Sequence, residues 1–507
     1  MKTPIILKSF AAPNGADQER GVTMVLVAVA MVAIVSMAAL SIDVVTLYLD
    51  REEAQRSADA AALAAARILS VSGITGDPSN ATGNWGPICG PAGLATQAAQ
   101  AVVGQNTVAS SVPGTISVSY SAGSGGAITS NADCTTLSAT AFGVNPLVTV
   151  KVTRAGLPTF FSRIWGNTSN SVSATATAEA FNSSNSGNVG NQTSGSITPV
   201  QPMCVKPWVV PNQDPLNPAR NATTYCNNPG GPGPCQPLVD VNTGKIWHSG
   251  ISLGGSGTNG AIGESFWLNA DCQKNGANCV FRRLAGNPVQ PQANFNNNNG
   301  NMQGPPSVAN LLFVPGQVAG TPTAIPSCSG AQAYEQAITG CDQPTNYQCG
   351  VPAANVVDLS VNPNPLTPNA VQCLTNQGNS GNTGNSTGQD YLNNNGTLGQ
   401  PIAYPFQILA GSGNPLVSAG LAANTPITSS PSIVALPIYD NTQNINAIGT
   451  TNVTFVGFLQ VFINAADNKG NVSVTVLNVA GCSNGGGTVG NPIPGTSPVP
   501  VRLITPP

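Results

Sequence analysis

The sequence predicts an α+β fold in three parts: a long membrane-spanning helix, a small α+β module that continues from it, and a β-rich domain that contains disulfides. Residues 21–69 predict the helix, because they hold no Pro and, after their first position, no Gly. Strict alternation of apolar and polar residues over 147–153 and 171–181 predicts two half-buried strands of an antiparallel sheet. All 12 cysteines follow the opening apolar run, which indicates disulfides in an oxidising compartment.

The helix begins with an uncharged run of 22 residues, from Gly21 to Ile42. At 1.5 Å per residue this run is about 33 Å long, enough to cross the hydrocarbon core of a bilayer. A cleaved signal peptide is the alternative, but its apolar region is usually shorter and ends in a break. Here the next turn residue is Gly73. We therefore expect a retained single-pass transmembrane helix at 21–42.

Positive charge predicts the orientation of this helix. Lys2, Lys8 and Arg20 precede the span, and Lys and Arg are enriched on the cytoplasmic side of a membrane protein. We therefore expect residues 1–20 to be a cytoplasmic flank. Everything after Asp43 would then lie outside the cytoplasm.

Residues 43–69 predict a helix with a small-residue face. Seven alanines lie between Ala58 and Ala66, and Glu52 can pair with Arg56 one turn later. A 3-4 spacing of apolar residues runs through Val44, Leu47, Ala54, Ala58, Ala61, Ala65 and Ile68. Such a face suits close packing against a helix or a sheet. Two interpretations stay open: the helix covers its own module, or it assembles with other chains.

The α+β module is expected over 43–181. Its two clear strands, 147–153 and 171–181, flank the segment LPTFFSRIWG (157–166), which predicts a short aromatic helical turn lying on the sheet. Ile116, Val118 and Tyr120 alternate in a further short strand. The polar, low-complexity residues that follow predict a linker at 182–200.

The β-rich domain is expected over 201–482. It is turn-rich up to about residue 400, and its fold there stays open. Residues 452–464 are apolar on both faces and predict a central strand, which DNKG turns into the alternating strand 471–480. The last part, 483–507, is Gly- and Pro-rich and is expected to be a tail.

Several cysteines of this domain are closely spaced and are the candidate disulfide residues. Their pairing stays open, and free thiols are the alternative. The candidates are Cys226, Cys235, Cys272, Cys279, Cys341 and Cys349.

Composition excludes several function classes. Only 7 % of the residues are charged and the net charge is −3, so a basic face for nucleic acid is not expected. The single His, His248, is far from any tight cysteine cluster, so zinc spacing is absent. No metal and no cofactor are expected.

One catalytic pattern needs an explanation. Residues 250–254 read G-x-S-x-G around Ser252, with His248 just upstream. A nucleophile elbow requires a helix directly after the Ser and a His well downstream, but GSGTNG follows here. We interpret the pattern as a turn in a Gly-rich chain and do not expect an enzyme. A hydrolase remains a third hypothesis.

Residues 20–69 resemble the TadG-like N-terminal segment of tight-adherence (Flp) pilus assembly proteins. The family pattern is an Arg-Gly start, an apolar span, an Asp, a Tyr, and then an Arg…Gln…Ala-Asp-Ala-Ala-Ala-Leu-Ala run. The matching positions in this chain are Arg20, Gly21, Asp43, Tyr48, Arg51, Gln55, Ala58, Asp59, Ala60, Ala61, Ala62, Leu63 and Ala64. The resemblance extends over about 20–181 and makes the α+β module similar to a pilin.

The resemblance implies a bacterial inner-membrane protein with a structural role in building or anchoring Flp-type adhesive pili. The implied partners are the membrane and other tight-adherence pilus proteins, with the cell wall or a surface ligand as a further possibility. Some longer relatives carry a von Willebrand A metal site, but the nearest match here, at Asp358, is followed by Pro363 and lacks the last Ser. A surface adhesin with the same anchor is the second hypothesis.

Overall fold

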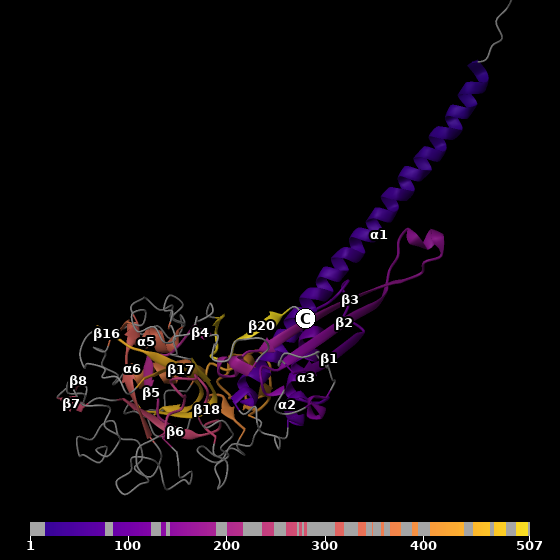
Figure 1. Cartoon of the computed structure of the whole chain (residues 1–507). Coiled ribbons are helices and arrows are strands. Elements are labelled where there is room, and N and C mark those ends of the chain that lie inside the picture. The colour runs from indigo at the N-terminus through magenta and orange to yellow at the C-terminus, as the bar shows by residue number, and fades with distance from the viewer. Residues whose placement is uncertain are drawn as a thin grey trace, which may run out of the picture.

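The computed structural model describes a membrane-length helix joined to a four-stranded module and a closed barrel (Figure 1). The described residues are 16–76, 85–122, 133–137, 142–188, 200–215, 236–247, 260–270, 273–275, 278–280, 310–318, 333–340, 347, 356–358, 366–376, 388–393, 406–440, 450–466, 471–482 and 493–504. The expected α+β class, with its long apolar N-terminal helix, is confirmed.

The helical elements of the described residues differ greatly in length, and the first has 56 residues. They are α1 (Ala16–Val71), α2 (Gly86–Cys89), α3 (Leu94–Gln105), α5 (Ala333–Thr339), α6 (Leu366–Leu374) and α7 (Pro415–Ser418), with the 3-10 helices η1 (Ile74–Gly76), η2 (Cys134–Thr136), η3 (Ser162–Trp165) and η4 (Ser183–Asn188).

The strands form several sheets. They are β1 (Thr115–Ser121), β2 (Leu147–Leu157), β3 (Asn170–Ala180), β4 (Val200–Pro202), β5 (Trp208–Pro211), β6 (Ser265–Ala270), β7 (Gln273–Asn275), β8 (Asn278–Val280), β9 (Asn310–Pro315), β10 (Gln317–Val318), β11 (Val356–Asp358), β12 (Tyr391–Leu392), β13 (Ile408–Leu409), β14 (Pro426–Ile427), β15 (Ile433–Tyr439), β16 (Thr450–Asn452), β17 (Phe455–Ala466), β18 (Val472–Gly481), β19 (Ile493–Gly495) and β20 (Val501–Ile504).

Helix α1 consists of two parts with different surroundings. From Val22 to Leu49 most side chains are exposed, and we call this part the stalk. From Ala54 onward the helix enters the apolar core of the module. The helix is long and apolar enough to cross a membrane. Only 6 % of its most apolar stretch is buried in the structure. In Figure 1 the stalk extends away from the body of the molecule, and the loop between β2 and β3 reaches out beside it.

The module is an antiparallel sheet in the order β1-β2-β3-β20, with α1 lying along β2 and β3 and packed against α3. The predicted strands 147–153 and 171–181 are confirmed as β2 and β3. As expected from the alternation, Val148, Val150 and Val152 are buried. The small side chains of β3 let α1 approach closely, so alanine faces meet across the helix–sheet contact.

The second body is a closed barrel in the order β15-β17-β18-β6-β9-β5. The hairpin expected at 452–480 is confirmed as β17 and β18, which pair antiparallel. Every residue of β17 is buried, as expected of a central strand. Phe266, Phe313 and Phe462 are among the fully buried aromatic residues of its core.

Two segments that the sequence assigned to connections are packed parts of the fold. Within the expected tail 483–507, β20 adds to the edge of the module by pairing with β3. Within the expected linker 182–200, residues 182–185 are buried, and η4, which begins at Ser183, lies against β18. Backbone pairing and buried amides supply the order here, and neither requires an apolar pattern.

Candidate functional site at the base of the stalk

Asp43, the first charged residue after the uncharged run, is clamped by the loop between β2 and β3. The backbone N–H of Phe160 donates to Oδ1 at 3.1 Å, and those of Phe161 and Ser162 donate to Oδ2 at 3.0 and 2.7 Å. Three consecutive N–H groups converge on one carboxylate, an arrangement that favours an anion. Ser162 opens η3, so Asp43 caps this turn from another element.

Local sequence shapes the loop, which we call the tip (157–166). Gly156 and Gly166 take φ values of 72° and 85°, a left-handed conformation that glycine adopts without strain. The Thr159 hydroxyl donates to the Asn167 carbonyl at 2.9 Å and closes the loop across its base. The sequence predicted this turn to lie on the sheet. Instead, it extends beyond the sheet and contacts α1, because the carboxylate there satisfies its backbone donors (Figure 1).

Burial around the clamp is confined to one side of the helix. Asp43 is 4 % exposed, and Ala39, one turn earlier on the same face, is 7 % exposed. The neighbouring Val44 and Val45 are more than half exposed. The tip therefore covers a strip of α1 and leaves the rest of the stalk surface open.

The apolar surface of the stalk continues past Asp43. Tyr48 is 65 % exposed and Leu49 is 53 % exposed, and the next charged residues are Asp50 and Arg51. From Asp43 to Leu49 the helix rises about 9 Å, close to the depth of one headgroup region of a bilayer. The change from apolar to charged side chains thus occurs at Asp50, about two turns beyond the clamp.

The other residues of the sequence motif fall into two groups. Tyr48 and Arg51 are exposed to solvent. Gly21 lies in α1, and the structure does not describe how exposed it is. Gln55 donates to Asp59 at 2.7 Å and to the Thr175 carbonyl of β3 at 3.3 Å. Ala58 and Ala61 are fully buried in the module core, and Leu63 packs against it. The alanine face therefore covers the sheet of its own module. The expected pairing of Glu52 with Arg56 is present at 3.6 Å.

The other end of α1 is joined to the barrel through buried amides. The Asn478 side chain of β18 donates to the Thr75 hydroxyl at 2.8 Å and to the Ser70 carbonyl at 3.2 Å. The Asn182 side chain donates to the Thr75 hydroxyl at 3.2 Å and to the Val479 carbonyl at 3.0 Å. We call these residues the joint. Buried, mutually bonded amides hold two elements in one relative position, because breaking any of them leaves an unsatisfied polar group.

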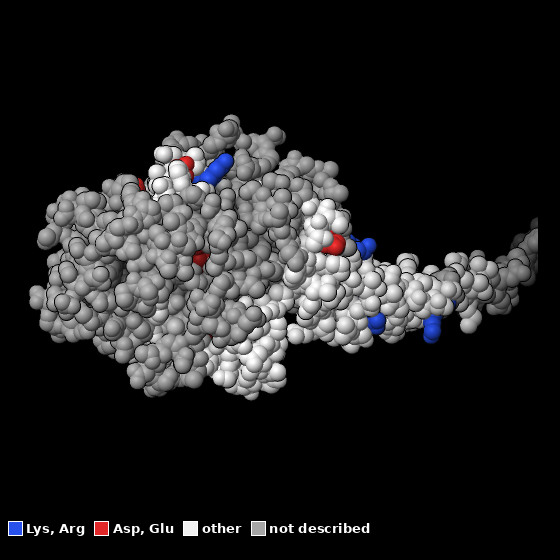
Figure 2. Space-filling model, turned by 90° about the horizontal axis from the view of Figure 1, so that it is seen from below, with Lys and Arg blue, Asp and Glu red and all other residues white. Residues whose placement is uncertain are grey.

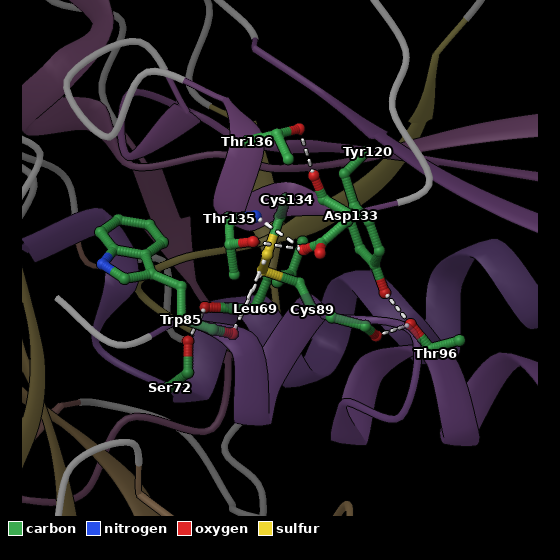
Figure 3. The surroundings of a disulfide bond; sticks show 11 residues. Leu69, Ser72, Trp85, Cys89, Thr96, Tyr120, Asp133, Cys134, Thr135 and Thr136 are labelled. Atoms are coloured by element: carbon green, nitrogen blue, oxygen red, sulfur yellow. Dashed lines mark hydrogen bonds between the residues drawn. A yellow bond between two sulfur atoms is a disulfide. The ribbon is translucent and has the colours of Figure 1, made fainter.

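A disulfide between Cys89 and Cys134 links α2 to η2 inside the module core (Figure 3). The Tyr120 hydroxyl lies 2.8 Å from the Thr96 hydroxyl, and burial raises the pKa of Tyr120 well above its usual range. Neither cysteine of this bridge was among the sequence candidates. Three more described cysteines are disulfide-bonded: Cys204, Cys373 and Cys482.

The candidate cysteines and the catalytic pattern fall where the structure gives no side-chain description. Cys279 lies on β8 opposite Lys274, with its side chain undescribed. The other five candidates lie outside the described residues, as do His248 and Ser252. Among the described residues, there is no group of three His, Cys, Asp or Glu side chains that could hold a metal.

On the face shown in Figure 2, the charged side chains of the described residues are few. The Lys, Arg, Asp and Glu seen there form no extended patch of one sign. Contacts made by the described part of this face would therefore depend on shape and apolar area more than on a field of one sign.

Residues 21–67 match the Tad family, described as Flp pilus-assembly TadE/G-like. The matched segment is the long helix, from the start of the stalk through the alanine face, and it includes the clamped Asp43. No curated protein and no solved structure matches the chain. The resemblance seen in the sequence is therefore confirmed for this helix. It associates the chain with Flp pilus assembly and with the membrane.

Sequence reasoning missed the partners of Asp43 and the joint. The tip was noted for its aromatic residues, but the contact is made by backbone N–H groups, which every non-proline residue carries. Asn478 stands among apolar residues of β18, and no role was expected for it. The sequence signal that could have pointed to the clamp was Asp43, a single charged residue at the end of an apolar run.

Proposed function

We propose that the chain is a membrane-anchored, non-catalytic scaffold of a tight-adherence (Flp) pilus assembly system. Its N-terminus lies in the cytoplasm, and the module and barrel lie outside the inner membrane. The observation that carries this proposal is the continuity of α1, which extends without a break from an exposed apolar stalk into the core of the module. The family match over the same helix supports the pilus assignment.

A scaffold must hold its outer domain at a fixed position relative to the membrane. The clamp at Asp43 and the joint contact at the Ser70 carbonyl hold α1 at points 27 residues apart, about 40 Å along a helix. Both contacts fix the helix against other parts of the same chain. The barrel is therefore presented at a set distance and orientation from the bilayer.

The stalk is the surface on which other pilus proteins would pack. Most of its apolar side chains are exposed in the described part of the structure, apart from the strip covered by the tip. In a membrane, helices associate through small and close-packing side chains, and the stalk contains several alanines between its larger residues. Lateral packing of residues 22–49 with other membrane helices is the proposed mechanism.

The test is complementation of a bacterial strain that lacks this protein, scored by pilus counts in electron micrographs. Full-length protein should restore piliation. A matched variant whose residues 22–42 are replaced by an unrelated apolar helix of the same length keeps the anchor and changes the packing surface. It should reach the membrane and fail to restore pili.

The outcomes separate the hypotheses. Normal piliation in the deletion strain would overturn the scaffold role. Normal piliation combined with lost surface attachment would favour the adhesin hypothesis. Restoration by the replacement helix would overturn lateral packing and leave anchoring as the only work of the stalk.

A further inference from the structure

We propose that the tip (157–166) is a second membrane contact, which enters the headgroup region of the bilayer beside α1, and that its partner is lipid. This inference rests on the proposed anchoring of α1 in the membrane. It adds a contact from a different part of the chain, 117 residues away from Asp43 in sequence.

The height of the tip along the stalk is fixed by the clamp. Three of its backbone nitrogens lie within 3.1 Å of the Asp43 carboxylate, and Asp43 directly follows the uncharged run. The tip cannot move away from the end of the span without breaking all three contacts. Any bilayer that holds 21–42 in its core therefore places the tip at its surface.

The exposed apolar residues of the stalk indicate that the bilayer surface lies beyond Asp43 along the helix. Exposed apolar side chains continue to Leu49, and charged residues begin at Asp50. Burial on the tip side extends back to Ala39, inside the uncharged run. The tip is thus flanked by lipid-compatible surface on both sides along the helix axis, and the clamp removes the Asp43 carboxylate from that environment.

The exposed side chains of the tip fit the headgroup region. Phe160 is 58 % exposed, although large aromatic residues are usually buried in soluble domains. Arg163 of η3 is also exposed. Aromatic residues gather at membrane interfaces, and Arg can bury its stem while its guanidinium reaches anionic headgroups.

The test is photochemical labelling of the full-length protein in vesicles of phosphatidylethanolamine and phosphatidylglycerol. A diazirine analogue of phenylalanine replaces one residue at a time, at position 160, 34 or 503. Ile34 is an exposed residue of the span, and Leu503 is an exposed residue of β20, which pairs with the end of β3 remote from the tip. Lipid adducts are measured by mass spectrometry after irradiation.

The proposal expects lipid adducts at 34 and 160, with a yield at 160 on the order of tenfold above that at 503, because interfacial aromatic side chains are surrounded by lipid. Adducts at 34 but not at 160 would overturn the inference and leave the anchor standing. Adducts at none of the positions would overturn the anchor itself. A protein adduct at 160 in place of lipid would identify the tip as a protein interface and also overturn the inference.

Discussion

At the scale of single residues, Asp43 decides how the module meets the stalk. A buried carboxylate is costly unless its oxygens are bonded, and three N–H groups of the tip meet that need at Asp43. The same contact caps η3 and holds the hairpin end against α1. The Asp43 side chain therefore connects α1 to a loop that is distant in sequence, because its carboxylate accepts the hydrogen bonds of that loop.

Replacing Asp43 tests this role. In Asp43→Ala the amides of Phe160, Phe161 and Ser162 lose their acceptor, so their hydrogen exchange should accelerate by about tenfold to a hundredfold. Asp43→Asn should give an intermediate rate, because its amide oxygen accepts without a charge. Exchange is measured by mass spectrometry on the full chain in detergent.

Asp59→Asn is the matched control, because Asp59 lies on the same helix, 16 residues after Asp43, and accepts a hydrogen bond from the Gln55 side chain. It should leave exchange at the tip unchanged. Equal exchange at the tip in wild type and Asp43→Ala would show that the clamp does not form.

The bridge between Cys89 and Cys134 is a second residue-scale determinant. It closes a loop of 45 residues, for which chain entropy gives a contribution of about 4 kcal/mol. A Cys89→Ser, Cys134→Ser double variant should therefore lower the free energy of unfolding of the module by about 4 kcal/mol. Urea unfolding followed by circular dichroism measures this.

Tyr120→Phe gives the comparison, since it keeps the ring and removes only the contact with the Thr96 hydroxyl. It should cost about 1 kcal/mol. A bridge variant no less stable than Tyr120→Phe would show that the disulfide contributes little to the folded module.

At the scale of elements, β20 completes the sheet of the module. Arg502 of this strand bonds Glu179 of β3 at 2.8 Å, and its guanidinium lies 5.0 Å from the centre of the Phe181 ring. The Glu179 side chain is 7 % exposed and that of Arg502 is 44 % exposed. Arg502 thus compensates the negative charge of the nearly buried Glu179 carboxylate.

Arg502→Ala should destabilise the module by about 1–2 kcal/mol, a value below that of a fully buried pair because Arg502 is half exposed. Most of the loss comes from the unpaired Glu179 carboxylate. Adding Glu179→Gln to Arg502→Ala should therefore recover part of the stability. Thermal unfolding of the single and double variants checks this, and equal losses in both would contradict the pairing.

At the scale of the whole molecule, Lys206 is a buried basic residue whose backbone N–H donates to Ala435 of the barrel strand β15. Lys206 is 5 % exposed, and its ammonium donates to the Gly340 carbonyl at 2.8 Å. Burial lowers the pKa of Lys206 to about 7. A free lysine has a pKa near 10.4. Between about pH 7 and pH 10.4, Lys206 is therefore protonated in the unfolded chain and neutral in the folded one, so the unfolded chain binds one more proton.

Stability of the barrel should therefore rise with pH above 7, by up to about 1.4 kcal/mol per pH unit from this group. Lys206→Met should remove the rise while keeping the volume of the side chain. Urea midpoints between about pH 6 and pH 9.5 measure both profiles. Parallel profiles would show that Lys206 is not buried in its neutral form.

The sequence was sufficient for elements that follow a regular pattern. The stalk followed from an uncharged run, β2 and β3 from alternation, and the β17–β18 hairpin from two apolar segments around a turn. In each case the physical reason is local: helix and strand periods fix which side chains share a face. The resemblance to the Tad family lies in the same helix and for the same reason.

What only the tertiary structure decided are the contacts between distant segments. The clamp on Asp43, the joint at Thr75 and the addition of β20 to the module depend on backbone donors and amides whose partners lie more than 100 residues away. Such groups carry no pattern that points to their partner, because any N–H fits any carboxylate. By itself the sequence determined an apolar helix of membrane-spanning length that continues into a small α+β module. The folded chain determined how that helix is held at Asp43 and at its C-terminal end.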